Sequence, residues 1–360
     1  MITTDVRPAL GTNGSAWDAL VDVAPLPSPF LRSWWLDGVA GPNPRFVIVR
    51  DDGDLIGGMA LEEDRPLGIA RLRPIGLLLG ADQLDIVAAP GREGDVEEAL
   101  RAWLGQCRAR VIDLVGCSEK TRLVAVLPRP RVEAVDVAPW IPLPASFSDF
   151  LALRSGDLRS QIDRPGRRLR REGVSYRVVE PAEVQRALTD LRRLHAHVFG
   201  TSSQFLPVFD RFARAAPAGI ARQELVLHEF VADGRTVAVN VCFEVAKRVS
   251  FYQGGRDTDR RWRGSGTALI AHSVEHAIEA GCRELDLLRG AEGYKRQWAT
   301  EQREILRLRA GRGIGGRLGL LGLALGARSR RAVAAASRSA RRTLATRKEG
   351  MDAGRPGGAP

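Results

Sequence analysis

The stretch RRWRGSGTALIAH, residues 260–272, combines the residue types that hold a phosphate group. Its glycines lie where an apolar run begins, and that run predicts a helix. Backbone N–H groups and the positive end of a helix N-terminus attract anions, and glycine lets an anion approach them closely. Arginines add charge-assisted hydrogen bonds. The segment therefore predicts a phosphate site, with a plain turn as the alternative, formed by Arg261, Arg263, Gly264, Ser265, Gly266 and Thr267.

A second group of reactive side chains follows in LDLLRGAEGYKRQW, residues 285–298. A predicted strand that carries Asp286 ends at Arg289 and Gly290, and Tyr294 and Lys295 come next. A carboxylate, a phenol and an ammonium group can supply proton transfer and charge stabilisation. These side chains are therefore candidates for chemistry beside the phosphate site.

The two segments together resemble a known family. The spacing R-x-x-G-x-G, from Arg261 to Gly266, resembles the loop with which GNAT acyltransferases hold the pyrophosphate of coenzyme A. With residues 285–298 it resembles the CelD-like and Fem-like acyltransferases, which have two GNAT folds in tandem. SGDLRSQIDRPGRRLRREG (155–173) and LRRLHAHVFG (191–200) resemble further elements of that family. The resemblance covers roughly residues 15–300, and Pro165 departs from it because proline weakens a helix.

The resemblance implies transfer of an acyl group from acetyl-CoA, or another acyl-CoA, to an amine. That reaction needs a deprotonated amine, a polarised thioester carbonyl and a proton for the leaving thiolate. Tyr294 is the predicted proton donor, and Lys295 is predicted to stabilise an oxyanion or to pair with a phosphate. Asp286 is predicted to act as a base or to orient Lys295; alternatively, it is a strand-end residue that pairs with Lys295 or Arg289. His195 is either an acceptor-side base or a packed helix residue.

No metal site is expected. His272 and His276 lie four residues apart on one predicted helix, but the sequence offers no evident third ligand. The four cysteines lie in apolar contexts without a C-x-x-C pair, so we expect buried thiols: Cys107, Cys117, Cys242 and Cys282. The basic segment offers either a solvated helix face or a contact for an anionic acceptor through Arg164, Arg167, Arg168 and Arg171.

The chain contains two loosely similar copies of one arrangement. RFVIVRDDGDLIGGMALEE (45–63) and HEFVADGRTVAVNVCFEV (228–245) each predict a hairpin, and a strand, a helix and a closing strand follow each one. We therefore expect an α+β fold with a mixed sheet and packed helices, made of two tandem GNAT-like folds. The first, residues 15–150, lacks the glycine loop and the Tyr-Lys motif and is expected to bind no coenzyme. The second spans residues 151–302 and contains the CoA site, and a basic, partly disordered tail covers residues 303–360.

The net charge of +11 lies entirely in this tail. Residues 303–360 contain 14 Lys+Arg and 3 Asp+Glu, whereas the preceding residues contain 40 of each kind. A neutral folded region argues against a nucleic-acid partner. The tail predicts either a basic helix that touches an anionic membrane through residues 311–348 or a solvated appendage. No signal sequence and no run of about 18 apolar residues is evident, so we expect a cytoplasmic protein, at most peripheral to the membrane.

These observations predict an acyl-CoA-dependent N-acyltransferase that acts on a small-molecule or glycan-precursor amine. The resemblance implies a role in cell-envelope or polysaccharide metabolism. One alternative is a Fem-type transferase that moves an amino acid from aminoacyl-tRNA onto a peptidoglycan precursor. The neutral folded region and the intact glycine loop argue against it. Another alternative is a non-catalytic GNAT scaffold at the membrane.

Overall fold

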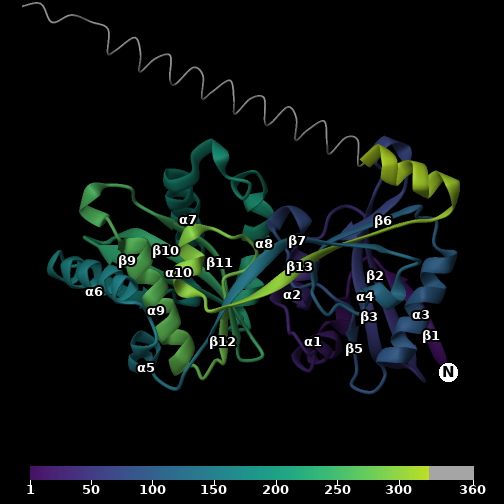
Figure 1. Cartoon of the computed structure of the whole chain (residues 1–360), viewed down its shortest axis with the longest axis horizontal. Coiled ribbons are helices and arrows are strands. Elements are labelled where there is room, and N and C mark those ends of the chain that lie inside the picture. The colour runs from purple at the N-terminus through teal and green to yellow at the C-terminus, as the bar shows by residue number, and fades with distance from the viewer. Residues whose placement is uncertain (324–360) are drawn as a thin grey trace, which may run out of the picture.

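The computed structural model describes residues 1–323. The predicted membrane-binding segment, residues 311–348, therefore lies largely outside the described residues. One continuous sheet forms the centre of the molecule, and two lobes surround it (Figure 1). The strands follow the order β1-β2-β3-β4-β6-β13-β7-β12-β11-β10-β9-β8, and β5 pairs with β3. Within residues 1–323 no helix has both the length and the apolarity to cross a membrane.

We call residues 1–130 the first fold; it is the purple and blue lobe of Figure 1. Its strands are β1 (Ile2–Arg7), β2 (Pro44–Asp51), β3 (Asp54–Asp64), β4 (Arg71–Pro74), β5 (Val87–Ala88) and β6 (Val111–Ser118). Its α-helices are α1 (Gly14–Asp22), α2 (Ser33–Val39), α3 (Glu93–Gln106) and α4 (Leu123–Val126).

We call residues 147–300 the second fold; it is the teal and green lobe of Figure 1. Its strands are β8 (Ser175–Val178), β9 (Leu225–Ala232), β10 (Arg235–Val245), β11 (Arg248–Arg256) and β12 (Glu284–Asp286). Its α-helices are α5 (Phe147–Ala152), α6 (Gly156–Arg171), α7 (Val184–Phe199), α8 (Phe209–Ala221), α9 (Ser265–Glu279) and α10 (Gly293–Trp298).

Both predicted hairpins are present. Asp52 and Gly53 turn β2 into β3 with φ angles of 46° and 95°, and Asp233 and Gly234 turn β9 into β10 with 51° and 72°. Two successive positive φ angles suit the right-handed twist of a two-residue hairpin. In each fold a helix then leads to a strand parallel to an earlier one, β4 with β6 and β11 with β12. The predicted α+β class with two tandem folds is therefore confirmed.

Two strands join the folds by crossing between them. β7 (Arg131–Pro142) follows the first fold, but its last residues pair with β12 of the second fold. β13 (Glu301–Gly311) follows the second fold, but it lies between β7 and β6 of the first fold. Each fold is therefore completed by a strand that leaves the other.

The predicted domain boundaries are wrong at three places. β1 begins at Ile2, so the first fold starts well before residue 15. The predicted boundary at residue 150 cuts through α5, whose buried Phe150 belongs to a core cluster of the second fold. The tail cannot begin at residue 303, because β13 buries Ile305 and Leu308 in the sheet. The arginines of β13 suggested a solvated tail, but Arg307 donates to Asp113 of β6 at 2.6 and 2.7 Å.

The cores of the two folds interlock. Phe30 and Trp35 of the first fold pack edge-on against Phe243 of the second, with ring centroids 5.6 and 5.5 Å apart. The Tyr252 hydroxyl on β11 donates a hydrogen bond to the Leu79 carbonyl of the first fold at 2.8 Å. Buried aromatic contacts of this kind stabilise an interface beyond their apolar area. The two folds consequently form one body, and parts of both can line one site.

Candidate functional site

A cavity of about 740 Å³ opens beside β11 in the second fold. It exists because β12 accompanies β11 only from Arg248 to Ser250, whereas β11 continues to Arg256. The edge of β11 beyond Ser250 therefore faces the cavity instead of a neighbouring strand. Leu79 and Gly80 of the first fold also line it.

One end of the cavity is the N-terminus of α9. Gly266 and Thr267 line it. The first helical hydrogen bond runs from Ala268 N to Gly264 O at 3.1 Å. The N–H groups of the three residues between them thus have no partner within the helix, and those of Gly266 and Thr267, which line the cavity, are available to a ligand. The predicted phosphate loop therefore has the backbone geometry of an anion site.

Gly264 also has a structural reason to be glycine. Its φ angle of +84° is left-handed, and a Cβ at this position would lie 2.7 Å from Cγ of Pro165. Pro165 lies inside α6, which runs without interruption over Gly156–Arg171 and so accommodates the residue that departs from the family pattern. Ser265 is fully buried and does not line the cavity, so it is not positioned to contact a phosphate there in this structure.

The two arginines predicted to bind the phosphate, Arg261 and Arg263, lie outside the cavity. Arg261 is paired with Glu172 at 3.2 Å and lies over the Trp262 ring at 4.4 Å, outside the cavity lining. Arg263 also lies outside the lining, and its carbonyl accepts a hydrogen bond from Arg168. Neither Arg261 nor Arg263 is therefore positioned at the cavity in this structure.

Arg256 is the cationic residue that sequence reasoning missed. It lines the cavity, and its Cδ would lie 3.2 Å from a Cβ at Gly266. Within residues 1–323 it has no carboxylate within 4.0 Å, so its charge is available to an anion. The signal was its position as the last residue of the strand FYQGGR, directly before the glycine loop.

Tyr294 and Lys295, on α10, also line the cavity. Partial burial and the nearby Glu292 carboxylate raise the pKa of Tyr294 to about 12, although 41% of the residue is exposed, and its phenol is protonated at neutral pH. The Lys295 ammonium donates to the carbonyls of Leu288 and Arg289 at 3.2 and 2.7 Å. It also pairs with Glu292 at 3.0 Å. In this arrangement Lys295 fixes the loop that forms the cavity wall.

Asp286 does not line the cavity, where its predicted role as a base would place it. It is fully buried and accepts a hydrogen bond from the Leu288 backbone N–H at 2.7 Å. Arg248 and Arg303 lie 3.5 and 3.4 Å away. Burial raises the pKa of Asp286, and the two arginines oppose that shift. Asp286 instead positions the turn that leads to Lys295.

His195 and Ser203 form a polar pair in the cavity wall. The imidazole Nε2 lies 2.9 Å from Ser203 Oγ, and Nδ1 lies 3.0 Å from the Gly254 carbonyl oxygen. A carbonyl only accepts, so Nδ1 bears the proton and Nε2 accepts from the serine hydroxyl. Ser203 Oγ in turn accepts the backbone N–H groups of Phe205 and Leu206. Burial lowers the pKa of His195, which favours the neutral imidazole that can take up a proton.

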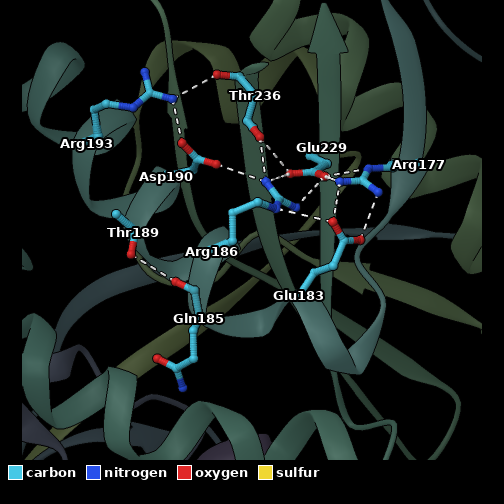
Figure 2. A network of polar contacts seen from close by, with 9 residues as sticks. All are labelled: Arg177, Glu183, Gln185, Arg186, Thr189, Asp190, Arg193, Glu229 and Thr236. Atoms are coloured by element: carbon cyan, nitrogen blue, oxygen red, sulfur yellow. Dashed lines mark hydrogen bonds and ion pairs between the residues drawn. The ribbon is translucent and has the colours of Figure 1, made fainter. Parts of the chain in front are cut away.

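An ion-pair network holds α7, the helix that carries His195, against the sheet (Figure 2). At its centre the Glu229 carboxylate of β9 is fully buried and accepts from Arg177 and Arg186 at 2.7 and 2.8 Å. Thr236 on β10 adds a hydroxyl bond to Glu229 at 3.0 Å. The buried carboxylate thus has two arginines and a hydroxyl as partners, and together they hold α7 against the sheet.

The remaining candidates lie elsewhere. His272 and His276 pair with different acids, Glu275 and Glu244, and no group of three or more side chains that could hold a metal ion occurs in the described part of the chain. The four cysteines are free thiols, and all except Cys107 are buried. On α6, three of the four singled-out arginines are exposed and form a solvated surface: Arg164, Arg167 and Arg171.

Comparison with known proteins agrees with this architecture. Residues 156–296 match the model of the acetyltransferase (GNAT) domain. No curated protein sequence matches the chain. Among solved structures the chain is similar to FemX, at 11% identity and a TM-score of 0.62 over 82% of this chain and 95% of that chain.

Two further structures have the same fold at low identity. One is a conserved protein of unknown function from Bacteroides thetaiotaomicron, at 13% identity and a TM-score of 0.59 over 85% of this chain and 99% of that chain. The other is L-PGS from Bacillus licheniformis, at 12% identity and a TM-score of 0.52 over 79% of this chain and 90% of that chain. Most residues that line the cavity thus fall in the segment that matches the model of the acetyltransferase (GNAT) domain, and most of the chain shares its fold with FemX.

Proposed function

We propose that the protein is an acyl-CoA-dependent N-acyltransferase, in the simplest case an N-acetyltransferase. The observation that carries this proposal is a single cavity that joins the N-terminus of α9 to Tyr294 within the GNAT-matched residues. The pyrophosphate of CoA fits the free amides of Gly266 and Thr267 and the unpaired Arg256. The unpaired edge of β11 provides backbone groups along which the thioester end can extend.

The residues of the cavity suggest the course of the proton transfers. An acceptor ammonium would lose a proton to Nε2 of His195, with the Ser203 hydroxyl relaying it. The amine nitrogen would then form a bond to the thioester carbonyl carbon, and the carbon–sulfur bond would break. Tyr294, whose phenol is protonated at neutral pH, would give its proton to the leaving thiolate, and the phenolate would take up the proton that the new amide nitrogen loses. General acids and bases contribute about 10²- to 10⁴-fold each when they are well placed.

The acceptor that we propose is a small-molecule or glycan-precursor amine of the cell envelope. The resemblance to CelD-like and Fem-like sequences supports this class. The cavity has room for it beside the His195 pair, where Phe199 and Gln204 also line the wall. We further propose that the protein acts in the cytoplasm.

Isothermal titration calorimetry with acetyl-CoA tests the proposal directly. We expect one site per chain with a dissociation constant in the micromolar range. Free CoA should bind similarly, because both ligands present the same phosphates to α9. Absence of binding by either ligand would contradict the proposed donor.

A second candidate function is a Fem-type transfer from aminoacyl-tRNA, which the whole-chain likeness to FemX favours. The balanced charge of the residues before the tail argues against a tRNA surface. Titration with aminoacyl-tRNA, in parallel with acetyl-CoA, separates the two candidates. Binding of tRNA but not of acetyl-CoA would establish this second candidate in place of the first.

A further inference from the structure

Residues 313–323 form a helix that docks on the first fold through its glycines. A Cβ at Gly316 would lie 2.3 Å from the Arg110 carbonyl oxygen, and one at Gly319 would lie 2.9 Å from Cγ2 of Val111. Only glycine permits such a close approach of a helix to β6 and its flanking loop. At its start, Arg312 donates to the Cys107 carbonyl oxygen at 2.5 Å, just beyond the C-terminus of α3. The helix therefore has a fixed inner face.

The opposite face of this helix is apolar and exposed. Ile314, Leu318 and Leu321 have relative exposures of 79%, 61% and 60%. Their spacing of four and three residues places them on one side of the helix, opposite Gly316 and Gly319. Three large aliphatic side chains in a row on an exposed helix face mark a surface that meets an apolar partner.

The charge of the adjoining sequence identifies that partner. From residue 305 to residue 348 there is no Asp or Glu, and between residues 312 and 348 there are ten Lys+Arg. A second copy of the chain would bring the same positive charge to the contact and be repelled. An anionic lipid surface satisfies both the apolar face and the charge.

We propose that residues 313–323 lie on the surface of an anionic bilayer, with Ile314, Leu318 and Leu321 inserted among the lipid chains. Because the inner face is docked on the first fold, membrane contact would also set the orientation of the whole molecule. The folds would then present their cavity at a constant angle to the lipid surface. This inference is independent of the donor and acceptor proposed above.

Vesicle sedimentation of the full chain tests the proposal. The probes are vesicles of phosphatidylcholine alone and vesicles in which a third of the lipid is phosphatidylglycerol. We expect the full chain to sediment with the anionic vesicles only, and added salt to weaken that binding without abolishing it. The triple variant Ile314→Gln, Leu318→Gln, Leu321→Gln should bind at least tenfold more weakly, although its charge is unchanged.

A matched control replaces three exposed aliphatic residues of other elements, Val23→Gln, Val124→Gln and Leu153→Gln, and should bind as the unmodified chain does. Circular dichroism and the melting temperature show whether each variant is folded. Equal binding of the triple variant and the unmodified chain would overturn the proposal, as would failure of the unmodified chain to bind anionic vesicles. A dimer of the unmodified chain that the triple variant loses, seen by light scattering, would assign the face to a second copy instead.

Discussion

The two folds have the same order of elements, but their central helices begin in opposite electrostatic settings. α3 of the first fold has Glu93 and Asp95 in its first turn, and Arg92 pairs with Asp95 at 2.6 Å. These carboxylates neutralise the positive end of the helix with side chains of the protein itself. α9 of the second fold has no acid in its first turn. One helix end is therefore already occupied by carboxylates, and the other is open to an anion from outside.

Cavities in the two folds also differ in size. A cavity of the first fold, beside Met59 and Cys117, measures only about 20 Å³, room for roughly one water molecule. The cavity of the second fold is about 740 Å³. Residues 75–83 of the first fold explain part of this contrast, because they extend toward the second fold. Asp82 there accepts the backbone N–H of Arg289 at 2.9 Å and so supports the cavity wall. The first fold therefore supports the cavity of the second fold.

Removal of β13 should have the largest effect on stability, because each fold is completed by a strand that crosses from the other. A chain that ends at Thr300 loses the strand between β6 and β7 and exposes the core around Ile305 and Leu308. We expect this chain to show no cooperative unfolding transition by calorimetry. A chain that ends at Leu323 keeps β13 and should melt as the full chain does. Cooperative melting of the shorter chain would show that the folds are separable.

Substitution at equivalent helix starts tests the contrast between α3 and α9. Gly94 and Gly266 are each the second residue of their helix. Gly266→Val should weaken acetyl-CoA binding by about 100-fold, equivalent to about 2.7 kcal/mol, because the new side chain covers the free amides. Gly94→Val meets no atom within 4 Å and should leave binding unchanged in calorimetry. Equal effects of the two changes would show that the N-terminus of α9 does not bind the phosphates of acetyl-CoA.

The His195 pair has no counterpart in the first fold, which contains no histidine. His195→Gln should lower acetyl-CoA turnover by about 100-fold and Ser203→Ala by about tenfold, with acetyl-CoA affinity unchanged. Ser202→Ala is the control, since that hydroxyl donates to the Phe199 carbonyl and has no contact with His195. Turnover is measured as thiol release.

The pH profile distinguishes a base from a packing residue at this position. The lowered pKa of His195 means that the imidazole stays neutral below its ordinary value of 6.5. Turnover should therefore hold constant as the pH falls to 6.5 and decline only below it. If turnover in the Ser203→Ala variant matched that of the unmodified chain at every pH, the relay would be excluded.

A smaller effect is expected at Tyr294, because water can replace a proton donor in part. Tyr294→Phe should lower turnover by about tenfold and leave the acetyl-CoA dissociation constant unchanged, since the phenol acts on the leaving thiolate. The two quantities are measured by thiol release and by calorimetry. A loss confined to affinity would identify Tyr294 as part of the donor-binding wall.

A further effect concerns stability against acid, which should differ between the folds because all five histidines lie in the second. His228 is 1% exposed, and burial lowers its pKa from 6.5 to about 3. The unfolded chain takes up a proton below pH 6.5 and the folded chain does not, so this stability is present above pH 6.5 and is lost as the pH falls. At pH 5 the loss is about 2 kcal/mol. Urea unfolding at pH 7 and 5 should show this loss, and His228→Asn should reduce it.

Several elements could be predicted because their signals are local. The two hairpins follow from Asp-Gly pairs between alternating strands, and the start of α9 follows from glycines before an apolar run. β13 was missed because its alternation is masked by arginines, which pair across the sheet with Asp113 and Glu133. The surroundings of Asp286 were hidden as well, because its sequence position nine residues before Lys295 does not reveal that the side chain is buried between Arg248 and Arg303.

The sequence by itself determined the two copies, the glycine loop and the Tyr294-Lys295 segment, because backbone turns and helix ends depend on nearest neighbours along the chain. Only the tertiary structure decided which groups meet at the cavity. Arg256 reaches the loop because β11 continues where β12 stops, and His195 meets Ser203 because α7 packs on Gly254 and Gly255. The tertiary structure also decided that β7 pairs with the second fold and β13 with the first. Such pairings are set by which buried surfaces and charges match across the sheet, and these matches join residues far apart in the chain.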